Sequence, residues 1–149
     1  MEIRNLEKSD INECIEIFKL NQPTEGWLDY PENRLIQEIE ASFLDNHFCK
    51  PEYFVSIMDE KVVGFAGFGQ LGFDDGVYGL FWIQVHPLYQ KIGIGKKLTE
   101  IRINKIKKLN GELIIATTKK IWHLERFGFQ QVSPRGDGYY LMQMMLDRN

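Results

Sequence analysis

The stretch 85–98 constrains the fold more than any other part of the chain, because three patterns meet there without a gap. An apolar run, 80–83, precedes the stretch, Gly93 and Gly95 lie inside it, and an apolar stripe at helical spacing follows the glycines. This succession predicts a strand, a tight glycine turn and a helix. The first turn of such a helix presents unpaired N–H groups and the positive end of its dipole, and glycine lets a phosphate approach the backbone without meeting a Cβ. We therefore expect a pyrophosphate site at this turn.

Two commoner phosphate-binding motifs are excluded. A P-loop needs four residues between its glycines and then Gly-Lys-Ser/Thr, and the chain contains no such run. The segment 67–72 has the glycine spacing of a dinucleotide-binding fingerprint, but that fingerprint must open a helix. Here the turn residues 73–76 and then the apolar run 77–85 follow it. We interpret the segment as the glycine-rich end of a β-hairpin.

The rest of the chain alternates between strand and helix patterns. Apolar and alternating runs predict strands over 2–6, 53–58, 61–68, 77–85, 113–116, 129–132 and 139–146. Helical spacing and capping residues predict helices that begin near residues 10, 31 and 94, and a fourth helix over 119–127. Leu98, Ile101 and Leu109 are expected to mark the buried side of the third helix. The order predicts a single domain, 1–149, of the α/β (α+β) class, with a mixed, mostly antiparallel sheet flanked by helices.

Charge and hydropathy narrow the classes of partner. A net charge of −3 gives no electrostatic reason to expect nucleic acid as a partner. No apolar stretch approaches the length that spans a bilayer, so we expect no membrane partner and a cytoplasmic location. His47, His86 and His123 are scattered and lack the spacing of a zinc site, so we predict no metal.

The residues around the glycine turn resemble a known family. Gln90, Gly93 and Gly95 have the spacing Gln-x-x-Gly-x-Gly and follow Val85-x-Pro87, which is similar to the acetyl-CoA signature of the GNAT (Gcn5-related N-acetyltransferase) superfamily. A weaker second likeness lies in 122–129, which ends in Gly-Phe. The resemblance implies the GNAT-like acyl-CoA acyltransferase fold, with acetyl-CoA as co-substrate. It also implies an N-acetyltransferase that moves an acetyl group directly to a primary amine of a small molecule, an amino acid or a peptide.

The same resemblance implies a set of coenzyme-binding residues. In the family, the amides after the glutamine hold the pyrophosphate, and the preceding strand pairs with the pantetheine arm. Carried onto this chain, the set is Ile83, Gln84, Val85, Gln90, Lys91, Ile92, Gly93, Ile94, Gly95 and Lys96. The N–H of Val85 is expected to face the acetyl carbonyl, where a backbone donor stabilises the developing negative charge.

The acid and the base are not where the family usually has them. The position of the tyrosine that protonates the thiolate is Leu124, and the strand positions that often carry a carboxylate or histidine are Gly79 and Phe81. None of these side chains ionises. Two substitutes are Glu112 as the base, at the start of a strand, and Tyr139 or the tyrosine beside it as the acid.

The acceptor end leaves several interpretations open. Trp27, Asp29 and Tyr30, together with Asp74 and Asp75, supply aromatic surface and negative charge that suit a cationic amine. The blank acid–base positions leave a non-catalytic acyl-CoA-binding sensor or regulatory module as an alternative. A nucleotide-binding protein that uses the glycine-rich hairpin end is a third possibility. The chain is expected to act as a monomer or a homodimer.

Overall fold

The structure, a computed structural model, describes residues 1–22, 32–45, 49–134, 136 and 138–147. Its strands are β1 (Glu2–Asn5), β2 (Glu52–Met58), β3 (Lys61–Gln70), β4 (Val77–Val85), β5 (Leu113–Thr118), β6 (Gln130–Pro134) and β7 (Tyr140–Met145). Its α-helices are α1 (Ile11–Asn21), α2 (Glu32–Glu40), α3 (Ile94–Lys108) and α4 (Ile121–Glu125). Short 3₁₀ turns are η1 (Lys8–Asp10), η2 (Ala41–Phe43) and η3 (Pro87–Tyr89). Strands and α-helices follow one another in the order that the sequence predicts.

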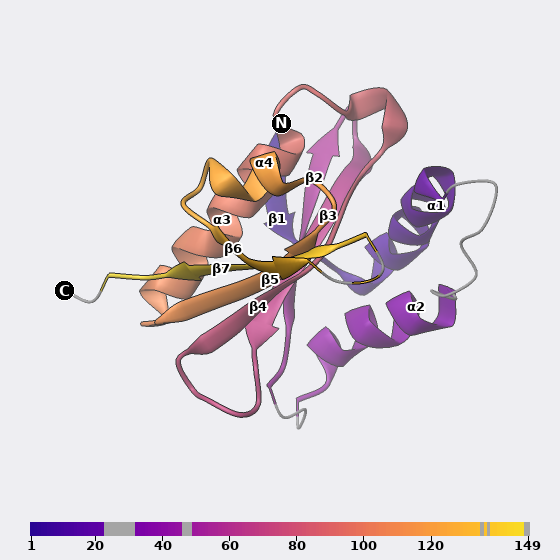
Figure 1. The fold of residues 1–149 in the computed structure, drawn as a ribbon. Helices are drawn as coiled ribbons and strands as arrows, with labels where there is room; N and C mark the ends of the chain where they lie inside the picture. Colours follow the sequence, from indigo (N-terminus) through magenta and orange to yellow (C-terminus); the bar gives the residue numbers. More distant parts are fainter. Residues whose placement is uncertain (23–31, 46–48, 135, 137, 148–149) are drawn as a thin grey trace.

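These strands form one sheet in the order β1-β2-β3-β4-β5-β7-β6. Neighbouring strands are antiparallel except β4 and β5, which run parallel because α3 returns the chain between them. Helices α1 and α2 cover one face of the sheet, and α3 and α4 cover the other (Figure 1). The mixed, mostly antiparallel class predicted from the sequence is confirmed. Among the described residues, no helix has both the length and the apolar character that a membrane crossing requires.

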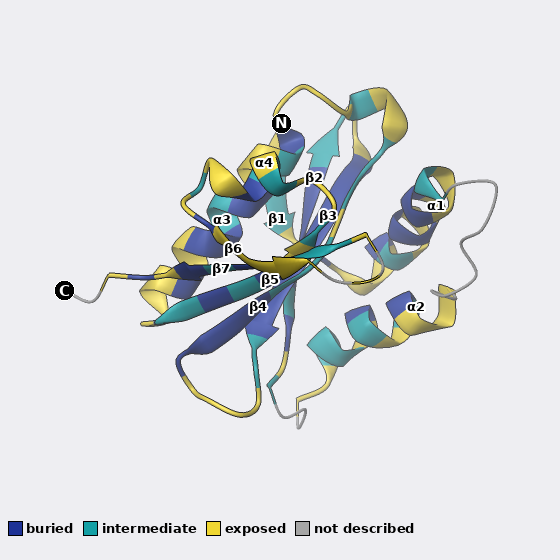
Figure 2. Ribbon diagram, in the orientation of Figure 1, coloured by how far each residue is buried: buried dark blue, intermediate teal, exposed yellow. Residues whose placement is uncertain are grey.

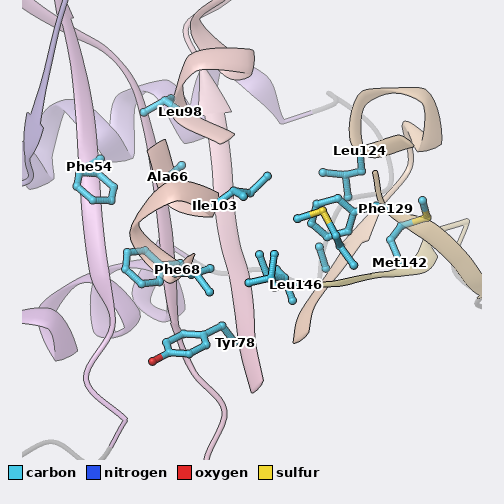
Figure 3. Close-up of a cluster of buried hydrophobic side chains, with 14 of the residues drawn as sticks. Phe54, Ala66, Phe68, Tyr78, Leu98, Ile103, Leu124, Phe129, Met142 and Leu146 are labelled. Carbon is cyan, nitrogen blue, oxygen red and sulfur yellow. The ribbon is translucent and has the colours of Figure 1, made fainter. Parts of the chain in front are cut away.

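Strand alternation divides the core between the two faces. Phe65 of β3 packs with α1 and α2, where Cys14 is fully buried, whereas Ala66 and Phe68 pack beneath α3 (Figure 3). The buried residues gather along the central strands and on one side of the longer helices (Figure 2). Each large apolar side chain buried in this way contributes roughly 1.5–3 kcal/mol, so the two clusters fix the helices against the sheet.

Helix α3 differs from the prediction at its end. Ile94 and Leu98 are buried as expected, but Leu109 is 46% exposed, so the prediction that it marks the buried side is wrong. The reason is that α3 ends at Lys108, and the chain turns away at Asn110 with a φ of +64°. The fourth helix, α4, is also shorter than the predicted 119–127.

The β4 strand separates from β5 along half of its length. The two strands pair only from Val77↔Leu113 to Gly79↔Ile115, and β5 then continues beside β7. A bulge in β4 accompanies the separation, because the β3–β4 register shifts between Ala66 and Gly67 and leaves Trp82 as the extra residue. Trp82 has a φ of +35°, which is uncommon for a side chain of this size. The later half of β4 therefore has a free edge toward β5.

Candidate active site

The separated strands open into a cleft of about 1200 Å³. The free edge of β4, the turn before α3, the end of β5 and helix α4 form one part of its wall, and helix α2 with the start of β2 forms the other part. The residues predicted to bind coenzyme line this cleft, with the exception of Ile92, which is 60% exposed on the turn. The predicted strand edge and the predicted glycine turn therefore lie in one place.

The turn before α3 presents backbone amides to the cleft. Gly93 takes a φ of +96°, the left-handed conformation that glycine adopts most readily, and α3 begins at the next residue. The first helical hydrogen bond runs from the N–H of Lys97 to the carbonyl of Gly93 at 3.0 Å. The N–H groups between these two residues have no intrahelical acceptor, since they precede the first complete turn. This arrangement is an anion site of the kind predicted from the sequence.

The free edge of β4 directs Val85 into the cleft. The N–H of His86 donates to the carbonyl of Val63 at 2.8 Å, and backbone groups alternate sides along an antiparallel ladder. The N–H and the carbonyl of Val85 therefore point away from β3, toward the side that β5 has left. On that side the carbonyl accepts hydrogen bonds from Asn21 Nδ2 and Gln90 Nε2, both at 3.0 Å. The direction agrees with the predicted role of the Val85 N–H.

Two predicted coenzyme ligands also brace the site internally. The Gln90 side chain is turned back onto the Val85 carbonyl and lies 3.3 Å from Asn21 Oδ1. Gln84 accepts a hydrogen bond from Asn21 Nδ2 at 2.9 Å. Asn21, the last residue of α1, thus joins the α1 layer to the end of β4. The sequence analysis did not single out Asn21, since a polar residue at a helix end is common.

The proposed acid and base lie at different ends of β5. Tyr139 lines the cleft, with Lys119 Nζ 5.0 Å above its ring, and Leu124 lines the cleft beside it. Glu112 lies at the closed end, where its side chain packs over Gly76 next to the β4–β5 pairing. Glu112 is not among the residues that line the cleft.

The predicted acceptor residues are not brought to the cleft in the described part of the chain. Asp74 and Asp75 lie in the exposed turn between β3 and β4, where Asp74 Oδ1 accepts the N–H of Gly76. Trp27, Asp29 and Tyr30 lie outside the described residues. Among the described side chains, no group of three or more His, Cys, Asp or Glu is placed to hold a metal ion.

A buried arginine that the sequence analysis missed supports the bulge. Arg102 of α3 is 2% exposed, and its Nη1 donates to the carbonyls of Gly67 and Phe81 at 3.1 and 3.3 Å. These two residues pair across the bulge, so the guanidinium supplies donors where the ladder is interrupted. Burial lowers the pKa of Arg102 to about 9, which leaves it charged at neutral pH. Its spacing of four residues from Leu98 was the available signal.

The buried polar cluster continues from Arg102 to helix α4. Arg102 Nη2 donates to Thr99 Oγ1 at 3.1 Å, and Thr99 Oγ1 lies 3.2 Å from His123 Nε2. The other ring nitrogen of His123 faces Arg126 Nη2 at 3.0 Å. Burial, followed by the positive charges of Arg126 and Arg102, lowers the pKa of His123 to about 4. His123 is therefore neutral at physiological pH, and it fixes α4 against the first turn of α3.

Known proteins share this arrangement. The model of the acetyltransferase (GNAT) family matches residues 12–129. Among solved structures, ribosomal-protein-S18-alanine N-acetyltransferase from Escherichia coli is similar, with a TM-score of 0.76 at 20% identity over 99% of this chain and 95% of that chain. PaiA N-acetyltransferase from Thermoplasma acidophilum, in complex with coenzyme A, has a TM-score of 0.76 at 18% identity over 97% and 98% of the two chains.

A GNAT family acetyltransferase from Brucella melitensis, in complex with acetyl-CoA, has a TM-score of 0.73 at 19% identity over 99% of this chain and 90% of that chain. At these identities the likeness of the solved structures concerns the fold, and the family is shown by the sequence model, which spans most of the chain. Among curated proteins, no sequence matches this chain closely enough to count as a relative.

Proposed function

Because this chain belongs to the GNAT family of acetyltransferases, we propose that it transfers an acetyl group from acetyl-CoA directly to a primary amine of a small molecule, an amino acid or a peptide. One observation carries the proposal: the free edge of β4 and the amide-rich turn before α3 line the same cleft. A strand edge and an anion site side by side suit a long ligand that ends in phosphates.

The residues that would hold the coenzyme fit its chemistry. The amides from Lys91 through Lys96 would bind the pyrophosphate, since an added Cβ at Gly93 would meet nothing within 4 Å and leaves the approach open. The free edge at Ile83, Gln84 and Val85 would pair with the amides of the pantetheine arm. Lysine and arginine side chains around this end of the cleft supply positive charge that favours a phosphorylated ligand; they are Lys91, Lys96, Lys119, Lys120 and Arg126.

The chain supplies two groups for the transfer itself. Bound acetyl-CoA brings a thioester, whose carbonyl carbon is open to attack by an uncharged amine. The N–H of Val85, directed into the cleft, would stabilise negative charge on the acetyl oxygen. Tyr139 would give a proton to the departing sulfur, since it lines the same cleft. Holding the thioester and the amine together supplies a large part of the rate by itself.

Calorimetry and an amine panel test the proposal. The purified protein is titrated with CoA and acetyl-CoA, and release of free thiol is followed with small amines, amino acids and short peptides. We expect saturable binding and amine-dependent thiol release, both lost in Gly93→Glu, which places a carboxylate in the anion site. No heat with either form of the coenzyme would overturn the proposal.

The alternative is a non-catalytic acyl-CoA-binding sensor or regulatory module. Leu124, Gly79 and Phe81 favour it, because none can ionise at positions where relatives carry the acid or the base. Tight coenzyme binding without thiol release for any acceptor would select this alternative. The proposed compartment is the cytoplasm, and sedimentation would decide between monomer and homodimer.

A further inference from the structure

The charges that line the cleft are distributed unevenly. Among the described lining residues, Glu38 of α2 is the only carboxylate. The cations of the lining are Arg34, Lys91, Lys96, Arg102, Lys119, Lys120 and Arg126. All of these except Arg34 belong to the coenzyme side, on α3, α4 and the segments before them. Glu38 therefore marks a chemically different end of the same cleft.

The Glu38 carboxylate is fixed beside the bulge of β4. Trp82 Nε1 donates a hydrogen bond to Glu38 Oε2, and Arg34 Nε lies 3.3 Å from Glu38 Oε1. The Trp82 ring is itself held edge-on against Phe18 of α1, with ring centroids 5.6 Å apart. Since Trp82 is the bulge residue, the carboxylate stands where the free edge of β4 begins. Its side chain is 37% exposed, so an incoming group can reach it.

The walls around Glu38 are apolar and aromatic. Tyr53, which is 4% exposed, lies across Gly67, where an added Cβ would clash with its ring. Burial, together with the charge of Glu38, raises the pKa of Tyr53, so its phenol stays uncharged and brings no second anion. Pro51 and Phe81 line the same end of the cleft.

The Phe81 ring also explains why the carboxylate comes from α2 rather than from β4. An added Cβ at Gly79 would lie 2.8 Å from Phe81 Cε1, so the ring occupies the space that a side chain at position 79 would need. A negative charge can reach this end of the cleft only from the opposite layer. Helix α2 packs there and carries Glu38 on the side that faces the sheet.

We propose that Glu38 binds the ammonium group of the acceptor, and that the acceptor is a primary amine with one positive charge on an apolar, ring-containing body. The proposal rests on the acetyltransferase function and names the substrate class of that site. One carboxylate pairs with one ammonium, and the aromatic walls receive the rest of the molecule. The exposed Arg34–Glu38 pair is weak, so an ammonium ion competes with it at little cost. Polyamines and aminosugars would leave further cations against a cleft that is already positive.

The test compares two substitutions that remove the same charge from the same helix. Glu38→Gln keeps an oxygen that accepts the Trp82 N–H, so the fold is retained and only the charge changes. Glu40→Gln is the matched control, since Glu40 is exposed and does not line the cleft. With 2-phenylethylamine as acceptor, we expect KM to rise about tenfold or more in Glu38→Gln and to stay unchanged in Glu40→Gln. The uncharged analogue 2-phenylethanol should inhibit all three proteins equally.

Spermidine and an aminosugar complete the acceptor panel. The proposal is supported if 2-phenylethylamine has the higher kcat/KM and loses it selectively in Glu38→Gln. It is overturned if the polycations are the better acceptors, or if the two variants have the same KM.

A direct binding measurement separates this proposal from the acetyltransferase function. Calorimetry of 2-phenylethylamine with the protein, free and saturated with CoA, needs no turnover. Amine binding that weakens in Glu38→Gln, without any thiol release, supports the amine subsite and counts against catalysis. Coenzyme turnover with other amines but no Glu38-dependent binding has the opposite meaning. Absence of amine binding in both forms of the protein overturns the subsite.

Discussion

Two glycines in the turn before α3 give a pair of substitutions with opposite expected effects. Gly93 has a φ of +96°, and an added Cβ there meets nothing within 4 Å, so Gly93→Ala introduces backbone strain without a clash. A left-handed conformation costs an L-residue about 1–2 kcal/mol. Gly95 lies within α3, and its added Cβ would be 3.8–4.0 Å from Ile83, His123 and Val85, which is ordinary van der Waals contact. Gly95→Ala should therefore stabilise the protein by up to about 1 kcal/mol.

The strain at position 93 can be divided between folding and binding. If the variant keeps the native turn, the whole 1–2 kcal/mol lowers the free energy of unfolding, and Tm falls by roughly 2–8 °C for a chain of this size. If the turn relaxes in the free protein, the amides leave their positions, and the same free energy weakens CoA binding instead, by about 5- to 30-fold. The coenzyme complex must lose about 1–2 kcal/mol of stability in either case.

Differential scanning calorimetry and titration calorimetry measure the two parts separately. Each protein is melted with and without saturating CoA, and Kd is measured at one temperature. We expect the Gly93→Ala complex to melt below the wild-type complex and the free Gly95→Ala protein to melt above the free wild type. A Gly93→Ala protein with wild-type Tm in both states would refute the assignment of a strained glycine to this turn, and with it the geometry of the proposed anion site.

Three further predictions concern the residues around the cleft. Arg102→Met leaves the buried carbonyls of Gly67 and Phe81 without their donor, at about 1–3 kcal/mol each, and chemical denaturation should show a loss of at least about 2 kcal/mol. Because the pKa of His123 is lowered in the folded state, its contribution to stability is fully present above pH 6.5 and is lost as the pH falls toward 4; a urea titration series should show this slope, about 1 kcal/mol after allowance for partial exposure, and His123→Gln should remove it. Tyr139→Phe should lower kcat about tenfold or more in steady-state assays without changing KM for acetyl-CoA, since the proposed proton transfer acts after binding, and an unchanged kcat would exclude Tyr139 as the acid.

Much of the fold could be predicted because its signals are local. Apolar alternation marks the strands, and the two glycines after Gln90 mark both the turn and its chemistry. The shorter α4 was missed because the start of a helix depends on its first hydrogen bonds. Here the N–H of Lys120 donates to Thr118 Oγ1, which keeps these residues in a turn.

The charged residues of the site could not be predicted in the same way. Glu112 was singled out for its distance along the chain from the glycine turn, yet the paired ends of β4 and β5 hold it away from the opening. Glu38 lies more than forty residues before Trp82, and only the packing of α2 on the sheet brings the two together. Arg102 looks like one more cation on a lysine-rich helix. Its burial follows from the bulge, which no short pattern in the sequence announces.

The Phe81 ring that fills the space above Gly79 also links the histories of these two positions. Any side chain introduced at position 79 would collide with that ring unless the ring had already been replaced by something smaller. A descendant of this protein could therefore acquire an ionisable group at position 79 only through a particular order of mutations, with position 81 changing first. An engineer who wished to move the negative charge from α2 to β4 would have to make the same two exchanges together.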